Sequence, residues 1–275
     1  MGYEHIAVKP VTARIGAEIE GIDLSRPMDD ATFSKVRKAL LEHCVIFFRD
    51  QQFDHAAQKA FGRRFGDLHV HPAIPGPEGH PEILPIHADE RSKYIAGERW
   101  HSDVSCDEEP PLGSILYLHT VPEYGGDTLF SNMYAAYDAL SDQMKTYLDG
   151  LTARHDGEPQ YRGRYRDQGV DDTGKVYPFA DHPVVRTHPE TRRKCLFVNP
   201  IFTTGINGLP RIESDAILRM LFEHTQQADF QVRFRWRPGS VAMWDNRCVQ
   251  HLAIWDYFPN VRSGFRVTIK GDRPV

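Results

Sequence analysis

The stretch FQVRFRW at residues 230–236 alternates strictly between apolar and polar side chains. This period of two is typical of a β-strand with one face on a core and the other face in polar surroundings. Turn-forming pairs such as Gly125-Gly126 and Pro238-Gly239 punctuate the chain. Further apolar runs of strand length lie at residues 45–48, 114–119, 184–187, 195–198, 241–244 and 265–269. Many short strands separated by turns predict a mainly β protein with a closed or double-sheet architecture.

Helices are expected to flank these strands. Capping residues precede several amphipathic segments: Asp29 before residues 33–41, Asp54 before residues 57–65, and Ser141 and Ser214 before two more. The chain is long enough for one sizeable core, so we expect a single domain over residues 1–275.

Residues 157–181 are rich in Gly, Arg, Asp and Tyr and show no periodicity. So long an irregular connection is usually functional or mobile. This segment is therefore either a lid over an active site or a plain surface loop.

Bulk composition excludes several classes of protein. The net charge is −5, and the 33 basic residues form no stripe among the 38 acidic ones, which disfavours a nucleic-acid partner. Apolar runs such as residues 44–48 are too short to cross a membrane, and the N-terminus does not resemble a signal peptide. The four cysteines lack the close pairs of a zinc site, so we expect reduced thiols in a cytoplasmic protein. We also expect a homo-oligomer.

Four His-x-Asp or His-x-Glu triplets could each contribute to a mononuclear iron site, which needs two imidazoles and one carboxylate. With 14 His and 38 acidic residues in the chain, chance alone gives about two such triplets, so spacing does not choose among them. Two of the four carry Pro at the centre, which suits a strand poorly. The triplets begin at His80, His87, His101 and His188, and His87 follows an apolar run that makes it a credible competitor.

Context favours the triplet at His101. Several motifs occur in order along the chain: Trp100-His101-Ser102-Asp103-Val104, Pro110-Pro111, Gly125-Gly126-Asp127-Thr128, Trp244-Asp245-Asn246-Arg247, Gln250-His251 and the segment from Arg262 to Arg266. Together they resemble the TauD/TfdA family of Fe(II)/2-oxoglutarate-dependent dioxygenases, which includes taurine, alkylsulfate and aryloxyalkanoate dioxygenases. The resemblance runs from residues 16–24 to residues 271–274 and covers nearly the whole chain.

The resemblance implies a jelly-roll fold of the double-stranded β-helix type, with Fe(II), 2-oxoglutarate and O2 as cofactor and co-substrates. It gives His101, Asp103 and His251 as the catalytic iron ligands. Because halogenating relatives lack the carboxylate that Asp103 supplies, it implies hydroxylation of a C–H bond. The expected substrate is a small organic anion, a sulfonate, alkyl sulfate or carboxylate, whose hydroxylation can release sulfite, sulfate or an alcohol.

The resemblance also assigns the ligand-binding side chains. Thr128 and Arg262 are expected on the distal carboxylate of 2-oxoglutarate, where a guanidinium can bind a carboxylate through two hydrogen bonds. His71, Phe202 and Arg266 fall on substrate-binding positions.

Departures from the taurine-cleaving members occur at the substrate end. Ala73 replaces a tyrosine, Gly97 replaces an asparagine, and the lid phenylalanine has no clear counterpart near residues 157–159. The cationic Arg266 is retained while polar groups are lost. We therefore expect a substrate that is larger or less polar than taurine.

Two other classes of protein remain as alternatives. One is a jelly-roll protein that binds a small molecule without turnover, although three intact ligand positions argue against it. The other is a metal-dependent hydrolase, which would need neither O2 nor a keto acid.

Overall fold

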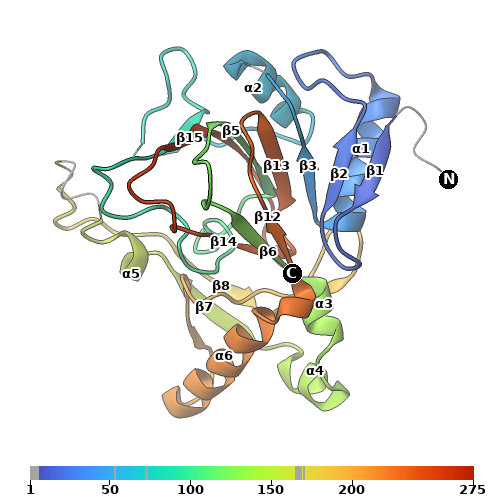
Figure 1. Ribbon diagram of the computed structural model, residues 1–275. Helices are drawn as coiled ribbons and strands as arrows, with labels where there is room; N and C mark the ends of the chain where they lie inside the picture. The colour runs from blue at the N-terminus through green and yellow to red at the C-terminus, as the bar shows by residue number, and fades with distance from the viewer. Residues whose placement is uncertain (1–5, 53, 72–73, 165–168, 170) are drawn as a thin grey trace.

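A computed structural model describes residues 6–52, 54–71, 74–164, 169 and 171–275, and its largest element is a seven-stranded sheet (Figure 1). Neighbouring strands are antiparallel except β2 and β3, which are parallel. In spatial order the strands are β1 (Ala7–Pro10), β2 (Ala17–Glu20), β3 (Val45–Phe48), β13 (Ser240–Asp245), β5 (Gly113–Thr120), β15 (Arg262–Ile269) and β4 (Leu84–Ala88).

Three smaller sheets complete the β structure. The first packs against the large sheet and has the order β12 (Gln231–Phe234), β6 (Thr128–Asn132), β14 (Val249–Ala253). The second has the order β11 (Thr203–Ile206), β7 (Thr152–Asp156), β8 (Phe179–Pro183), and the third pairs β10 (Lys194–Leu196) with β9 (Val185–Thr187).

Successive side chains of the central strands of the large sheet point to opposite faces. Both faces are buried, because each of them packs against a separate hydrophobic core. Phe47 and Trp244 lie in the core shared with the β12–β6–β14 sheet, and the ring of Phe47 stacks on Phe234 with centroids 3.9 Å apart. The adjacent Phe48 and Met243 lie in a second core, beneath the helices α1 (Asp30–His43) and α2 (His55–Arg63). The core between the large sheet and the β12–β6–β14 sheet also lines the cavity described below.

The remaining helices are short or lie at one end of the molecule, where Figure 1 shows α4 and α6 projecting below the sheets. They are α3 (Met133–Asp138), α4 (Asp142–Leu148), α5 (Glu158–Tyr161) and α6 (Arg211–Thr225). The predicted caps of α1, α2 and α4 are confirmed, since the side chains of Asp29, Asp54 and Ser141 each accept a backbone N–H of the first turn.

The predicted start of the last helix at Ser214 is wrong. Helix α6 begins at Arg211, after Pro210, and the Ser214 hydroxyl instead accepts the backbone N–H of Ile206 at 2.8 Å. The serine therefore fastens the helix to strand β11 and does not cap it.

The predicted fold class is confirmed: two β-sheets face each other across a core, with helices outside. Residues 157–181, expected to be irregular, contain α5 and the first residues of β8. Residues 165–168 and 170 of this segment lie outside the described part of the chain.

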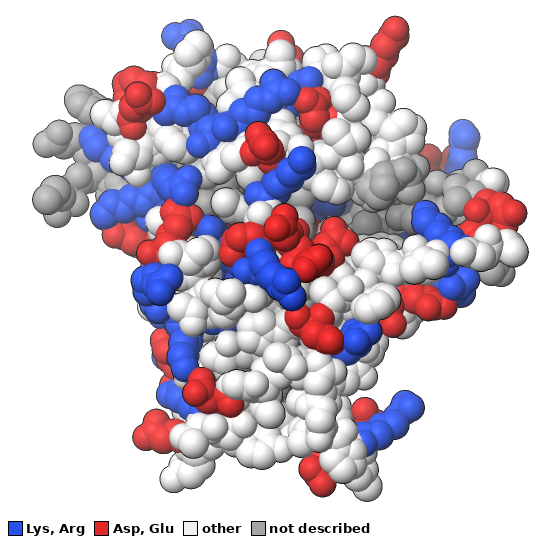
Figure 2. Space-filling view, turned by 180° about the vertical axis from the view of Figure 1, so that it is seen from behind, with Lys and Arg blue, Asp and Glu red and all other residues white. Residues whose placement is uncertain are grey.

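Basic and acidic side chains are intermixed on one face of the molecule. In Figure 2, which views the molecule from behind, Lys and Arg side chains lie interspersed with Asp and Glu. Among the described helices, none has the length and apolar character needed to cross a membrane. All four cysteines are buried and free of disulfide bonds. A cytoplasmic location and self-association stay predictions.

Candidate active site

A cavity of about 650 Å³ lies between the large sheet and the β12–β6–β14 sheet. Strands β4, β5, β6, β14 and β15 contribute its walls, together with residues 91–97 and the region around α5. All of the site residues expected from the sequence line this one cavity: His71, His101, Asp103, Thr128, Phe202, His251, Arg262 and Arg266.

The three predicted iron ligands converge at one wall of the cavity. Their ligand atoms all lie within 4.8 Å of one another, and the three residues are buried. His101 and His251 are brought together by paired backbone hydrogen bonds between the two residues, 3.1 and 2.8 Å long. Asp103 follows His101 by two residues and completes the set.

The distances among these atoms suit a shared cation better than direct hydrogen bonds. Nε2 of His101 lies 3.6 Å from Oδ1 of Asp103, and Nε2 of His251 lies 3.9 Å from the same oxygen. Both separations exceed hydrogen-bond length, whereas two metal–ligand bonds of about 2.1 Å can span up to about 4.2 Å. Two imidazoles and one carboxylate are the donor set of a facial triad for Fe(II). The residues present therefore fit the metal.

The surroundings keep both imidazoles in a state that can bind a metal. Nδ1 of His101 lies 2.8 Å from the carbonyl oxygen of Arg99, so it carries the proton and leaves Nε2 free. Burial, followed by the nearby His101, lowers the pKa of His251 well below its usual range, which keeps this ring neutral. The indole of Trp244 lies beside the His251 ring, with centroids 4.7 Å apart.

The carboxylate of Asp103 is held ionised. Burial alone would raise its pKa, but the Arg266 guanidinium, with Nη1 3.0 Å from Oδ1, holds that pKa well below its usual range. The hydroxyl of Ser114 donates to Oδ2 of Asp103 at 2.9 Å. The acid is thus already in the form that a metal requires.

Arg262 reaches the cavity from the start of β15 as a buried cation. It is only 6% exposed, its Nε donates to the carbonyl of Gly126 at 3.2 Å, and no carboxylate in the described ranges forms an ion pair with it. The indole of Trp236 connects it to Thr128: the guanidinium carbon lies 5.5 Å from the ring, and the indole N–H donates to the Thr128 hydroxyl at 3.0 Å. A buried guanidinium without a counter-charge fits an anionic ligand.

The three predicted substrate residues lie around the metal-binding wall. Phe202 belongs to an apolar cluster with Val104, Cys106, Ile201 and Tyr161, and its ring centroid lies 5.9 Å from that of Tyr161. Arg266 contacts Asp103 as described above.

His71 is neutral near pH 7. Burial, and then Arg266, lower its pKa to about 4, and its Nδ1 accepts the backbone N–H of Ile74 at 2.9 Å. Its ring can therefore exchange hydrogen bonds with a ligand without adding a charge.

Of the two small residues that replace a tyrosine and an asparagine of the taurine-cleaving members, Ala73 lies outside the described residues. Gly97 lines the cavity, but a Cβ atom added there would lie 2.9 Å from Cε1 of His101. Its backbone φ is +83°, a conformation that favours glycine. Gly97 therefore makes room for the His101 ring.

The competing triplets form ion pairs instead of a metal site. Glu82, the acidic member of the triplet that begins at His80, pairs with Lys59 and Arg63. His87 Nε2 lies 3.5 Å from Asp89 at the cavity rim, and no second histidine in the described chain joins that pair to make a metal-binding group.

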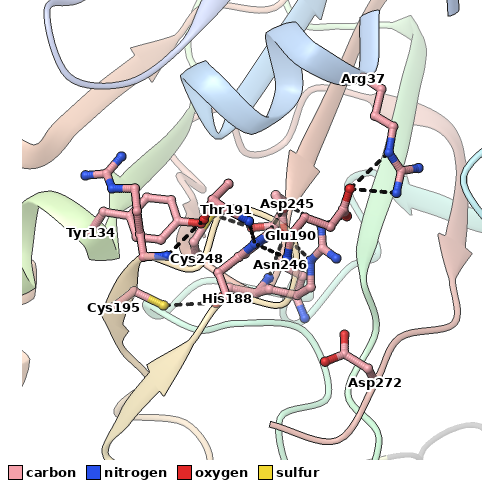
Figure 3. Close-up of polar contacts among 12 residues, drawn as sticks. Arg37, Tyr134, His188, Glu190, Thr191, Cys195, Asp245, Asn246, Cys248 and Asp272 are labelled. Atoms are coloured by element: carbon pink, nitrogen blue, oxygen red, sulfur yellow. Dashed lines mark hydrogen bonds and ion pairs between the residues drawn. The ribbon is translucent and has the colours of Figure 1, made fainter. Parts of the chain in front are cut away.

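The triplet at His188 belongs to a second buried group of possible ligands, with Asp245 and Cys248 (Figure 3). Here Nδ1 of His188 accepts two backbone N–H groups, so Nε2 carries the proton that points at Asp245, 3.1 Å away. Asp245 also binds Arg247 through two hydrogen bonds, and this guanidinium would repel a cation. The group is an internal ion-pair network.

Sequence reasoning missed several lining residues, among them Tyr161 and Val104. Tyr161 faces Phe202 from α5, inside the segment without periodicity, where its aromatic character was the available signal. Val104 lines the cavity with a backbone φ of +46°, which is rare for a β-branched residue and had no signal in the sequence.

Comparison with known proteins agrees with this geometry. Residues 7–268 match the family described as "Taurine catabolism dioxygenase TauD, TfdA family". The chain is 36% identical over 279 residues to an alpha-ketoglutarate-dependent sulfate ester dioxygenase of Pseudomonas putida, covering 98% of this chain and 90% of that one. It is 33% identical over 285 residues to an alpha-ketoglutarate-dependent sulfonate dioxygenase of Saccharomyces cerevisiae, covering 98% and 68%.

A solved structure supports the same relationship. The crystal structure of a taurine dioxygenase from Burkholderia xenovorans superposes with a TM-score of 0.85 at 38% identity, covering 98% of this chain and 93% of that one. These relatives are dioxygenases, so the comparisons do not support a silent binding protein or a hydrolase. The chain belongs to the TauD/TfdA family and is an Fe(II)- and 2-oxoglutarate-dependent dioxygenase.

Proposed function

We propose that this dioxygenase binds Fe(II) through His101, Asp103 and His251 and hydroxylates a small organic anion. The observation that carries the proposal is the convergence of these three side chains on the wall of the cavity that also holds Arg262 and Arg266. Iron with 2-oxoglutarate and O2 supplies the oxidising chemistry when bound. The residues of the chain orient the reactants and exclude water.

Arg262 and Thr128 bind the distal carboxylate of 2-oxoglutarate. The support is the buried guanidinium, which pairs with no carboxylate among the described residues, and the hydroxyl that Trp236 fixes beside it. Two charge-assisted hydrogen bonds from one guanidinium would orient the co-substrate with its keto-acid end toward the iron ligands.

Arg266, His71 and Phe202 receive the substrate. Arg266 supplies the cationic anchor, neutral His71 supplies a hydrogen bond, and Phe202 with Tyr161 supplies an apolar wall. Relatives that act on sulfonates and sulfate esters support an anionic head group. The apolar wall favours a tail longer or less polar than that of taurine, because each buried methylene adds about 0.8 kcal/mol.

We further propose that residues 157–181 act as a lid within a single domain of residues 1–275. Two contacts support this: the Arg164 guanidinium donates to the carbonyl of Ile95 at 2.9 Å, and the Tyr94 hydroxyl donates to the carbonyl of Arg164 at 2.7 Å. They join the segment to the loop of residues 91–97 that lines the cavity.

The metal assignment is tested by titrating Fe(II) anaerobically into metal-free variants. His101→Ala and His251→Ala should abolish turnover and weaken iron binding, because each removes one of three ligands. His87→Ala should bind iron as the wild type does, because its imidazole pairs with Asp89 at the rim. Iron binding retained by His101→Ala and lost by His87→Ala would overturn the assignment.

The substrate class is tested by comparing kcat/KM for taurine, a medium-chain alkyl sulfate, a medium-chain alkanesulfonate and an aryloxyalkanoate. The alkyl sulfate or the alkanesulfonate should be better than taurine, and Arg266→Ala should lose activity on these anions. Taurine as the best substrate, or an Arg266→Ala enzyme as active as wild type, would contradict this view of the cavity.

A further inference from the structure

Three consecutive buried residues, Asp245, Asn246 and Arg247, lie where β13 ends and the chain turns toward β14. Their exposed fractions are 1, 0 and 3%. Such a run of polar side chains in a core requires a partner for each group. The partners divide into two sets, one at the metal site and one on the opposite side.

Asn246 contacts the main chain of Asp103 through both ends of its carboxamide. Its Oδ1 accepts the backbone N–H of Asp103 at 2.6 Å, and its Nδ2 donates to the carbonyl of Asp103 at 3.0 Å and to that of Pro111 at 3.1 Å. The main chain that carries the carboxylate is therefore tied to the β13–β14 turn, which also leads to His251.

The backbone directly after Asp103 needs such support. Val104 has a φ of +46°, and a β-branched residue in the left-handed region is strained by about 1–3 kcal/mol. A strained conformation persists only where its surroundings impose it. The two hydrogen bonds from Asn246 act on the peptide groups at either side of Asp103 and so oppose relaxation of this segment.

An ion-pair network of largely buried side chains holds Asp245 and Arg247, the neighbours of Asn246, and Figure 3 shows Asp245 with His188 and Glu190. Arg247 donates to both carboxylate oxygens of Asp245, at 2.8 and 2.7 Å, and forms an ion pair with Glu190 at 2.9 Å. His188 lies 3.1 Å from Asp245, and Glu190 in turn accepts from Arg37 of α1 at 2.7 and 3.0 Å. The turn that carries Asn246 is thus fixed to β13, to residues 188–191 and to helix α1.

We propose that Asn246 is a positioning residue for the metal site, which it serves by holding the main chain of Asp103, and that the Asp245–Arg247–His188–Glu190 network keeps Asn246 in place. This inference rests on the proposed role of Asp103 as an iron ligand. Groups that orient metal ligands are worth roughly 10–100-fold in metal affinity. The triplet at His188 therefore contributes to the iron site indirectly.

The first test is anaerobic calorimetric titration of Fe(II) into metal-free Asn246→Ala, with Asn246→Ser as a second variant that keeps a polar group. Both should fold and bind Fe(II) roughly 10–100-fold more weakly than wild type. Wild-type affinity in either folded variant would overturn the role of Asn246.

The matched control is Asp272→Asn, which removes the negative charge that pairs with the fully buried Arg186, 2.8 Å away. This change should lower the melting temperature of the metal-free protein and leave Fe(II) affinity unchanged. An equal loss of affinity in the control would show that iron binding follows general stability, and would overturn the proposal.

The role of the network is tested by Glu190→Gln alone and combined with Asn246→Ala. If Glu190 acts through Asn246, Glu190→Gln weakens Fe(II) binding by itself but adds nothing to Asn246→Ala. No effect of Glu190→Gln, or independent losses that multiply in the double variant, would exclude the network. His101→Ala distinguishes failure of the proposed function from failure of the positioning role. Iron binding retained in His101→Ala contradicts the proposed function. Iron binding that is lost in His101→Ala but unchanged in Asn246→Ala contradicts only the positioning role of Asn246.

Discussion

Gly97 determines how closely the chain passes the His101 ring. A methyl group at this position would lie 2.9 Å from Cε1 of His101, closer than side-chain carbons pack. We expect Gly97→Ala to push the imidazole away from Asp103 and His251 and to lower Fe(II) affinity at least roughly tenfold, an effect as large as loss of a ligand's orienting partner. Anaerobic titration of the metal-free variant measures it.

Gly79 provides the control for that substitution. Its φ of +74° is close to the +83° of Gly97, but nothing lies within 4 Å of an added Cβ. Gly79→Ala should therefore lose about 1 kcal/mol of stability from backbone strain and keep full iron affinity. Equal iron affinities in the two variants would show that contact with His101 is unimportant.

Arg262 is expected to affect the binding of 2-oxoglutarate separately from the binding of iron. Removing a charge-assisted bond from a partly desolvated site costs about 2–5 kcal/mol, so Arg262→Ala should raise the KM for 2-oxoglutarate about thirtyfold or more. Arg233→Ala is the control, because that arginine is largely exposed and pairs with Asp127. Steady-state kinetics at varied 2-oxoglutarate concentration measures this KM in both variants. An unchanged KM in Arg262→Ala would refute the proposed role of Arg262.

Among the elements, strand β7 carries a histidine that makes stability depend on pH. Burial, and then the nearby His182, lower the pKa of His155 to about 3, and its Nδ1 lies 2.9 Å from the Ser105 hydroxyl. An unfolded histidine titrates near 6.5, so between these values the unfolded chain binds a proton that the native ring does not. The contribution of His155 to the free energy of unfolding is fully present above about pH 6.5. It decreases as the pH falls, and the decrease amounts to about 2 kcal/mol near pH 5.

Urea unfolding of wild type and His155→Gln at about pH 7 and about pH 5 tests this expectation. Glutamine can keep a hydrogen bond to Ser105 but does not titrate, so the variant should lose less stability on acidification. Buried histidines other than the neighbouring His182 are present in both proteins and cancel in the comparison. The same pH dependence in both proteins would show that His155 does not contribute.

Elements with an uninterrupted apolar or strictly alternating pattern were predictable, and those in which polar residues interrupt the pattern were not. The runs at residues 45–48 and 241–244 are strands β3 and β13 because both faces of the large sheet are buried. Strand β7, with the sequence TARHD, gave no apolar signal, since Arg154 forms an ion pair across to Asp181 of β8. Strand β14, VQHLA, carries the metal-binding candidate His251 in place of an apolar residue.

At the scale of the whole molecule, the site could be located in the sequence only by combining motifs that lie far apart along the chain. Four similar triplets were indistinguishable by spacing, and the resemblance to the family chose the one at His101. In the fold, His101 and His251 become neighbours across 150 residues of chain, through backbone hydrogen bonds that no local pattern encodes. The roles of Val104 and Asn246 likewise arise from tertiary contacts alone.

The C-terminal residues after β15 return to β9, and this closure should be important for global stability. The backbone N–H of Thr187 donates to the carbonyl of Val275 at 2.6 Å, and the fully buried Arg186 pairs with Asp272 at 2.8 Å. Nε and Nη1 of Arg186 have no hydrogen-bond partner among the described residues, so Asp272 is the carboxylate that offsets its charge there. Leaving a buried charge uncompensated costs about 3–5 kcal/mol.

We therefore expect Asp272→Ala to lower the free energy of unfolding by about 3 kcal/mol, somewhat less than a fully buried pair because Asp272 is 39% exposed. Arg186→Met in the same chain should restore most of that loss, since it removes the unpaired charge and keeps an apolar side chain of similar length against the Phe197 ring. Denaturant unfolding of the two single variants and the double variant measures the coupling. If the double variant were as unstable as the two single losses combined, Asp272 would act through the path of the tail and not through the charge of Arg186.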